Sequence, residues 1–193
     1  MTLFDHAFGL SAVVLGLGLA EMALRLQQLM AAGKRVKWAV EPILLAAIVF
    51  QIIVVLWLGA WRDHEMKSIT LGAVELNVLA ILAPFIVAAG IFPKATDSGT
   101  IDLHSHYDRS RGFLFGTLAI GLMINWATQV MRIAPTLHGA GDWLRFIPLS
   151  IPYYGLIPYV LMTFIRTRWL NIAALAFVLL WFGSRVVGFT LTA

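Results

Sequence analysis

Long apolar segments are the feature of this sequence that most restricts its fold. A lipid bilayer takes about 20 apolar residues per crossing, and six such segments follow one another at about residues 3–30, 36–61, 68–92, 111–131, 143–165 and 169–191. The mean hydropathy of +0.86 and the 60% share of apolar residues exclude an ordinary soluble domain. We therefore expect an all-α integral membrane protein whose six transmembrane helices form a single transmembrane domain.

Helices explain the apolar segments better than the strands of a membrane barrel. Barrel strands alternate polar and apolar residues over about ten positions, and the segments lack that alternation. A helix also satisfies its own backbone hydrogen bonds inside the hydrocarbon layer. Short matches between the two halves of the chain raise the alternative of a weak 3+3 inverted repeat. These matches are Phe8-Gly9 with Phe115-Gly116 and Leu76-Asn77 with Leu170-Asn171.

The basic residues predict the orientation of the segments. One side of the expected membrane carries Arg25, Lys34, Arg35, Lys37, Lys94, Arg109, Arg111, Arg166 and Arg168, and the other carries Arg62, Lys67, Arg132, Arg145 and Arg185. The larger set predicts the cytoplasmic side, so we expect a multi-pass protein of the bacterial inner membrane with both termini in the periplasm. The basic residues form no stripe interleaved with aromatic residues, which argues against nucleic acid as a partner.

Several kinds of site are excluded by residues and motifs that the sequence lacks. With no Cys, the chain has no disulfide, thiolate metal site or catalytic thiol. A Gly-rich phosphate loop, a His-Glu-x-x-His motif and a Gly-x-Ser-x-Gly motif are also absent. We therefore expect no catalytic residue and no metal site, and the sequence indicates no particular cofactor.

Polar residues in the outer half of the segments need an explanation, because a charge at mid-bilayer costs at least about 2.5–3.5 kcal/mol. At about 1.5 Å of rise per residue, Glu75 and Arg185 lie at similar depth, and we expect them to pair. Three amides, Asn77, Asn125 and Gln129, fall in the same half. The functional interpretation is an outward-facing polar pocket for a small polar ligand or ion. The alternative is that Arg185 reaches the membrane surface and the amides bond between helices.

A second set of polar residues occupies the inner half. Glu21 and Arg25 are four residues apart on one helix face and are expected to pair. Glu41 precedes Pro42 at the cytoplasmic start of the second segment, where we expect water to reach it. Gln51 lies near mid-bilayer and is expected to face another helix. These groups are interpreted either as structural pairs or as a proton path through Glu21, Glu41 and Gln51.

The long connection at 93–110 is expected to be an interfacial loop, whose second half is able to form a short helix leading into the fourth segment. It contains His104 and His106. In an extended chain these two side chains share one face, and with a neighbouring carboxylate they would approach a metal site, although nothing supplies a third ligand. The alternative is a membrane-surface helix with Tyr107 at the lipid headgroups and Arg109 and Arg111 on phosphates.

The fifth segment is expected to be irregular because it contains three prolines, at positions 148, 152 and 158. An internal proline removes a helix hydrogen bond and clashes with the preceding turn. Unwound backbone lines substrate sites in some transporters. A kinked packing helix is the alternative interpretation.

Three stretches of the sequence resemble a group of uncharacterised bacterial inner-membrane proteins of about 200 residues. They are LGLGLAEMALRL (15–26), FQIIVVLWLGAWRDHEMKSIT (50–70) and DLHSHYDRSRGFLF (102–115). The group has an Asp-Leu-x-x-x-Tyr-x-x-x-Arg stretch before its fourth span, which Asp102, Leu103, Tyr107 and Arg111 match. The resemblance covers roughly the first 115 residues, and it implies fold and location without an activity.

Two kinds of function fit these observations. The first is a small channel, transporter or ligand-sensing protein that uses the outward-facing pocket. The second is a non-catalytic accessory or assembly subunit that packs against a larger membrane complex. In both cases the lipid bilayer is a partner, and the small soluble surface favours a homo-oligomer or a complex.

Overall fold

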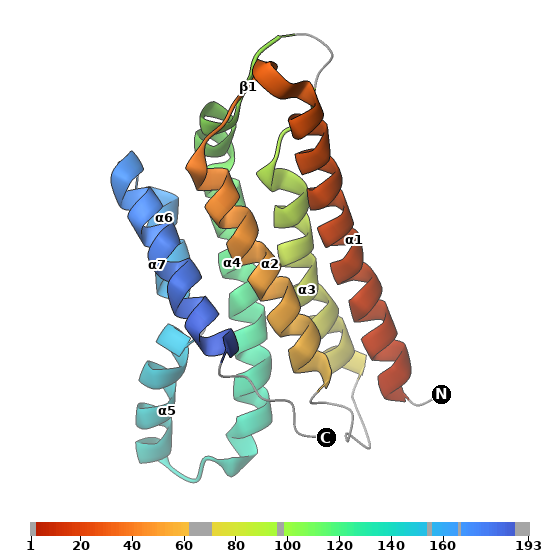
Figure 1. Cartoon of the computed structure of the whole chain (residues 1–193). Helices are drawn as coiled ribbons and strands as arrows, with labels where there is room; N and C mark the ends of the chain where they lie inside the picture. The colour runs from red at the N-terminus through yellow and green to blue at the C-terminus, as the bar shows by residue number, and fades with distance from the viewer. Residues whose placement is uncertain (1–2, 62–70, 96–98, 154–155, 166, 188–193) are drawn as a thin grey trace.

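A computed structural model describes residues 3–61, 71–95, 99–153, 156–165 and 167–187 of the chain. About 89% of the described residues are helical, and the successive helices α1 to α4 run in alternating directions side by side (Figure 1). The helices are α1 (Leu3–Ala32), α2 (Val40–Trp61), α3 (Leu71–Ile91), α4 (Leu103–Ile133), α5 (Ala140–Tyr153), α6 (Leu156–Phe164) and α7 (Arg168–Val187). Short 3-10 turns, η1 (Gly33–Arg35) and η3 (Ala134–Thr136), follow α1 and α4.

Four helices are long and apolar enough to cross a membrane. The candidate spans are Phe8–Arg35, Val40–Gly59, Val74–Ile91 and Leu103–Thr136. A shorter apolar helix covers Arg168–Ser184. The helical membrane-type fold expected from the sequence is thereby confirmed at this level, while the fifth and sixth crossings and the internal repeat stay predictions.

One end of the bundle, which we call the loop end, is closed by a pair of two-residue strands. Strand β1 (Val36–Lys37) pairs in parallel with β2 (Ile101–Asp102), with Val36 opposite Ile101. This pairing joins the α1–α2 connection to the α3–α4 connection. Gly33 allows the chain to leave α1 in the required direction, because its φ of 57° is a conformation that favours glycine.

The second half of the long connection is helical, which is the short helix that the sequence allows before the fourth segment. Residues 103–110 form the first turns of α4, ahead of the expected start of that segment at 111. The Asp102 carboxylate caps the helix by accepting a hydrogen bond of 3.0 Å from the backbone N–H of Ser105. The expected loop over 93–110 is therefore limited to its first part, since this cap starts the helix at Leu103.

Two helices are described in the proline-rich fifth segment. Helix α5 contains Pro148 and Pro152, and helix α6 contains Pro158. Residues 154 and 155 lie outside the described residues, so an irregular chain between the two helices stays a prediction.

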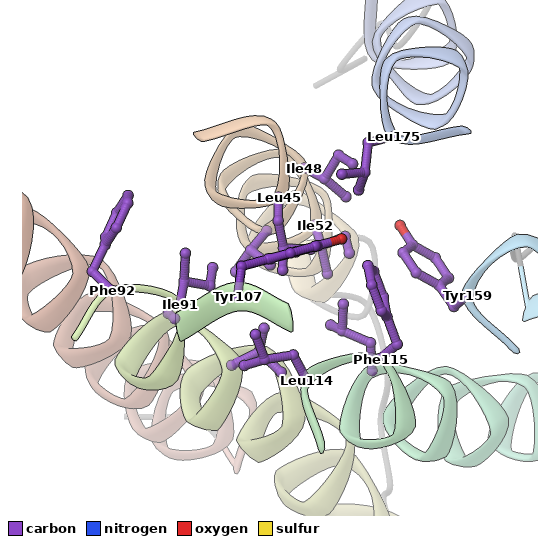
Figure 2. Close-up of a cluster of buried hydrophobic side chains, with 14 of the residues drawn as sticks. Leu45, Ile48, Ile52, Ile91, Phe92, Tyr107, Leu114, Phe115, Tyr159 and Leu175 are labelled. Carbon is purple, nitrogen blue, oxygen red and sulfur yellow. The ribbon is translucent and has the colours of Figure 1, made fainter. Parts of the chain in front are cut away.

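The apolar core lies between α2, α3, α4, α6 and α7, where side chains from all five helices meet (Figure 2). Its fully buried members include Leu45, Ile48, Phe92, Phe115 and Tyr159. Helix α3 packs against α1 and α4, α7 packs against α2, and α6 packs against α4. The core thus fixes the ends of α2, α4 and α7 next to one another at the loop end.

Candidate functional site

A buried carboxylate at the loop end is the centre of the candidate site. Glu41 lies in the first turn of α2 and is only 1% exposed. Its Oε1 accepts a 2.7 Å hydrogen bond from Nε of Arg168 in α7. Nδ1 of His104 in α4 lies 3.1 Å from the same oxygen, within ion-pair distance but without hydrogen-bond geometry. The expectation that water reaches Glu41 is wrong, because these side chains cover it.

Three helices bring these groups together because α2, α4 and α7 all begin at the loop end (Figure 1). The N-terminus of a helix carries a partial positive charge that stabilises a nearby carboxylate. Glu41 benefits from this in α2, and Arg168 is the first residue of α7. One carboxylate therefore links helices that are far apart in the sequence.

A second polar layer lies one turn further along α4 and α7. The Tyr107 hydroxyl donates a 2.6 Å hydrogen bond to Oδ1 of Asn171, and Nδ2 of Asn171 donates to the carbonyl oxygen of Ile165 at 3.4 Å. Arg111 donates to the same Ile165 carbonyl. This layer connects α4 to α7 and to the segment that follows α6.

The expected surface positions of Tyr107 and Arg111 are therefore wrong. Tyr107 is 2% exposed and Arg111 is also buried, because both reach inward to polar groups near the start of α7. Arg109, on the same helix, is exposed as expected. A helix in this place presents one face to the bundle, which the interfacial interpretation did not consider.

Some polar atoms at these positions have no hydrogen-bond partner. Within the described part of the chain, the buried side-chain atoms of this kind are Oε2 of Glu41, Oε1 of Gln51, Nδ1 of His104 and the hydroxyl of Tyr159. A buried polar atom without a partner is rare in proteins and is often explained by a ligand or an ordered water. The Glu41 carboxylate is therefore able to accept a hydrogen bond or a proton at Oε2 while Oε1 holds Arg168.

Gln51 faces another helix, as the sequence predicts. Its Nε2 lies against Gly183 of α7, since a Cβ built on that glycine would be 3.1 Å from it. A larger residue at 183 would thus displace the amide. The glycine lets α7 approach α2 at this level.

The predicted pair of Glu21 and Arg25 is confirmed. Arg25 Nε donates to Oε1 of Glu21 at 2.7 Å, and its NH1 donates to the carbonyl oxygen of Phe92 at 3.3 Å. These bonds tie α1 to the end of α3. The Glu21–Arg25 pair therefore stabilises the contact between α1 and α3, whereas Glu41 links other helices. This geometry favours the structural interpretation of Glu21 over a proton path.

The outer-half residues are only partly described. Glu75 is exposed on α3, and Asn77, Asn125 and Gln129 are half-buried on α3 and α4. The side chain of Arg185 lies outside the described residues, so its pairing with Glu75 stays a prediction.

The two neighbouring histidines contact different groups. His104 is next to Glu41, whereas Nε2 of His106 is 3.0 Å from the carbonyl oxygen of Gly90. Among the residues described, no three His, Cys, Asp or Glu side chains are grouped as a metal site requires.

Several residues of the site were not recognised in the sequence as members of a site. Arg168 was interpreted only as an orientation signal, and Asn171 only as part of a possible repeat. Tyr159 had no local signal beyond its place in the irregular fifth segment. A buried carboxylate in an apolar segment needs a cation, but the sequence alone offers many arginines for that role.

No family model, curated protein or solved structure matches the chain. The function is therefore argued from the arrangement of its side chains.

Proposed function

We propose that this protein is a small multi-pass membrane protein that binds a small polar solute at Glu41 and either transports or senses it. The observation that supports the proposal most is the buried Glu41 carboxylate, which has one oxygen on Arg168 and the other without a partner. A buried charge is costly unless it is paired and hydrogen-bonded. The buried oxygen without a partner is a group that a ligand or an ordered water would satisfy.

The surroundings of Glu41 restrict the chemistry of the solute. Oε2 accepts hydrogen bonds and cannot donate them while the carboxylate is ionised. Arg168 already supplies a positive charge, and His104 supplies a second one when it is protonated. These charges repel a metal cation. A proton or a neutral hydrogen-bond donor fits better.

Transport or sensing is supported by the position of the carboxylate between three helices. Glu41 belongs to α2, His104 to α4 and Arg168 to α7. A solute that binds Oε2 weakens the ion pair between Glu41 and Arg168, which holds α7 against α2. Binding would then change how α7 packs on α2, and a population shift between two packings is the basis of both transport and signalling.

The membrane arrangement completes the proposal. In this arrangement α5 and α6 together form the fifth crossing and α7 forms the sixth. The six crossings then divide into two halves of three crossings each. The basic residues place the loop end in the cytoplasm of a bacterium and both termini in the periplasm. The outward-facing pocket around Glu75 and Arg185 would then lie on the opposite side from Glu41.

Single introduced cysteines test this arrangement, because the chain has no native cysteine that would also be labelled. Lys34 and His138 are exposed at opposite ends of the bundle. In intact cells, a membrane-impermeant maleimide is expected to label His138→Cys and not Lys34→Cys. The reverse pattern would show that the orientation is wrong, and labelling of both or neither would contradict the arrangement.

A specific observation also supports the accessory-subunit function. Large aromatic side chains are exposed where α6 ends and α7 begins, with Phe164 74% and Trp169 79% exposed. Either lipid or another chain covers such side chains in a membrane. Gentle purification from native membranes tests this, since a stoichiometric protein partner would favour the accessory function and purification as a lone homo-oligomer would favour the solute-binding one.

The solute site itself is tested by thermal unfolding of the purified protein. Ammonium, urea, glycerol and sodium are added in turn to the wild type, to Glu41→Gln and to the control Glu21→Gln. A solute that binds the folded state raises its melting temperature by mass action. At least one of the two neutral solutes is expected to stabilise the wild type and the control more than Glu41→Gln, whereas ammonium and sodium are not. Equal responses of all three proteins would show that Glu41 is only a structural link.

A further inference from the structure

The polar atoms without partners are confined to one sector of the bundle. Those found in the described residues belong to α2, α4 and α6, and none belongs to α1 or α3. Helices α2 and α6 both pack against α4 and α7. The sector between α2, α4, α6 and α7 therefore differs from the rest of the interior.

These atoms follow one another from the loop end inward. Glu41 and Gln51 are ten residues apart on α2, which is about 15 Å along a helix. The Tyr107–Asn171 hydrogen bond lies one turn inward of His104 along α4. Phe115 connects the two tyrosines, since its ring centroid is 6.3 Å from that of Tyr107 and 6.4 Å from that of Tyr159.

In Figure 2 the hydroxyls of Tyr107 and Tyr159 point toward one another from α4 and α6. Tyr159 is 1% exposed, so bulk water outside the bundle does not satisfy its hydroxyl. A hydroxyl in this place needs a small internal partner.

We propose that this sector binds a track of water molecules that leads from Glu41 past Tyr159 to Gln51 and carries protons along it. The inference rests on the proposed function in taking Glu41 as the group at the cytoplasmic opening. Buried water typically makes about three hydrogen bonds to polar groups that would otherwise be unsatisfied, and the unpartnered oxygens of Glu41, Tyr159 and Gln51 are groups of this kind.

Protons move along such a track by exchange between neighbouring oxygens. A protonated water of the track bound next to Oε2 of Glu41 gives one proton to that oxygen and becomes water. Glu41 then gives that proton to the next water of the track and returns to the carboxylate. The titratable and charged groups that face Glu41 during this exchange are Arg168 from α7 and His104 from α4.

Radiolytic footprinting tests the track directly. A brief X-ray pulse makes hydroxyl radicals from bound water, and these oxidise the side chains beside it. The full-length protein is mixed with H2-18O for milliseconds before the pulse, and mass spectrometry reads both the oxidation and the isotope. Phe92 is the matched control, because it is an equally buried aromatic residue that lies on the far side of the core from Tyr159 (Figure 2).

We expect Tyr159 to be oxidised at least about ten times faster than Phe92 and to carry 18O. Equal oxidation of the two residues would overturn the proposal. Oxidation of Tyr159 without 18O would also overturn it, because the water would then be isolated from the loop end. Tyr159→Phe, which keeps the ring, is expected to lower the oxidation of Met162 on the same helix several-fold, and an unchanged rate would contradict a water bound at the hydroxyl.

The outcome separates this inference from the proposed function. A solute that stabilises the protein only when Glu41 is present would support the solute site. If Tyr159 in the same protein is not oxidised faster than Phe92, the water track would be contradicted. A labelled track in a protein whose stability does not respond to any solute would remove the solute site.

Discussion

Helix α4 packs against α3 through one kind of contact and against α6 and the start of α7 through another. The α3 contact depends on small residues: a Cβ on Gly121 would lie 2.3 Å from that of Ala83. The other contact is made by Tyr107, Arg111 and their hydrogen bonds to Asn171 and Ile165. The same helix therefore has a tightly packed apolar side and a polar side.

The difference shows how the two halves of the bundle are held together. In a membrane, helices gain little from leaving lipid, so they associate through close packing or through polar contacts. Close packing joins α1, α3 and α4, where Gly18 also lies against the backbone of Phe85. Polar contacts also occur there, from Arg25 to the Phe92 carbonyl and between His106 and the Gly90 carbonyl. Polar contacts join α2, α4 and α7, and the unpartnered buried side-chain atoms found in the described residues lie on α2, α4 and α6. We place the function in that sector for this reason.

Removing the cation of the polar side is expected to have the largest effect. Arg168→Met leaves the Glu41 carboxylate buried without its charged partner. Breaking a buried pair in this way costs about 3–5 kcal/mol, and because Arg168 is half exposed we expect the lower end of this range. Chemical unfolding in detergent, followed by circular dichroism, measures the loss. Arg109→Met, which changes an exposed arginine of α4, is expected to cost less than about 0.5 kcal/mol, and equal losses would contradict a buried charge pair.

Adding one methyl group on the close-packed side is expected to have the next largest effect. Gly121→Ala forces α3 and α4 apart, and overpacking of this kind costs about 1–3 kcal/mol. The control is Gly116→Ala on the same helix, where no atom lies within 4 Å of the added carbon. That change is expected to stabilise the helix by up to about 1 kcal/mol. Thermal unfolding of both variants checks the difference, and a neutral Gly121→Ala would show that the contact is looser than described.

Removing a single hydroxyl from the polar side is expected to have a moderate effect. Tyr107→Phe takes away the donor to Asn171, and the loss of one hydrogen bond costs about 1 kcal/mol. Tyr159→Phe removes a hydroxyl that has no partner within the protein, so its effect on the free energy of unfolding should be smaller. Chemical unfolding of the two variants side by side makes the comparison. A larger loss for Tyr159→Phe would mean that its hydroxyl has a stronger partner than a bound water.

The smallest effect is expected at the start of α4, where Asp102 caps the helix. The Ser105 N–H donates to the Asp102 carboxylate and holds the pKa of that carboxyl below its ordinary value of 3.8. A lowered pKa gives stability that is present above the ordinary pKa and is lost as the pH falls through the lowered one. Asp102→Asn keeps an acceptor oxygen but does not titrate. Its melting temperature should therefore fall less than that of the wild type between pH 7 and pH 3, and an equal fall would contradict the role of the carboxylate.

Local patterns in the sequence predicted local features correctly. The apolar segments predicted the helices, and a spacing of four residues predicted the bond between Glu21 and Arg25. Gln51 was expected to face a helix because lipid offers an amide no partner, and it lies against Gly183. Each of these depends on residues close in the chain or on the apolar surroundings alone.

The predictions for Glu41, Tyr107 and Arg111 were wrong for a common reason. Their partners are distant in the chain: Arg168 lies 127 residues from Glu41, and Asn171 lies 64 residues from Tyr107. A sequence offers several arginines and amides at matching depth, and nothing local selects one of them. The fourth segment was expected to start at 111, although a short helix before it was anticipated, because the capping role of Asp102 depends on the turn that follows strand β2.

By itself, the amino-acid sequence determined that the chain forms apolar helices and where most of them begin and end, because hydropathy and helix geometry act over neighbouring residues. The tertiary structure alone decided which polar groups meet, because the packing of α2, α4 and α7 at the loop end selects Arg168 and His104 for Glu41. A charge inside an apolar bundle is stabilised only by the groups that packing brings within a few ångströms of it.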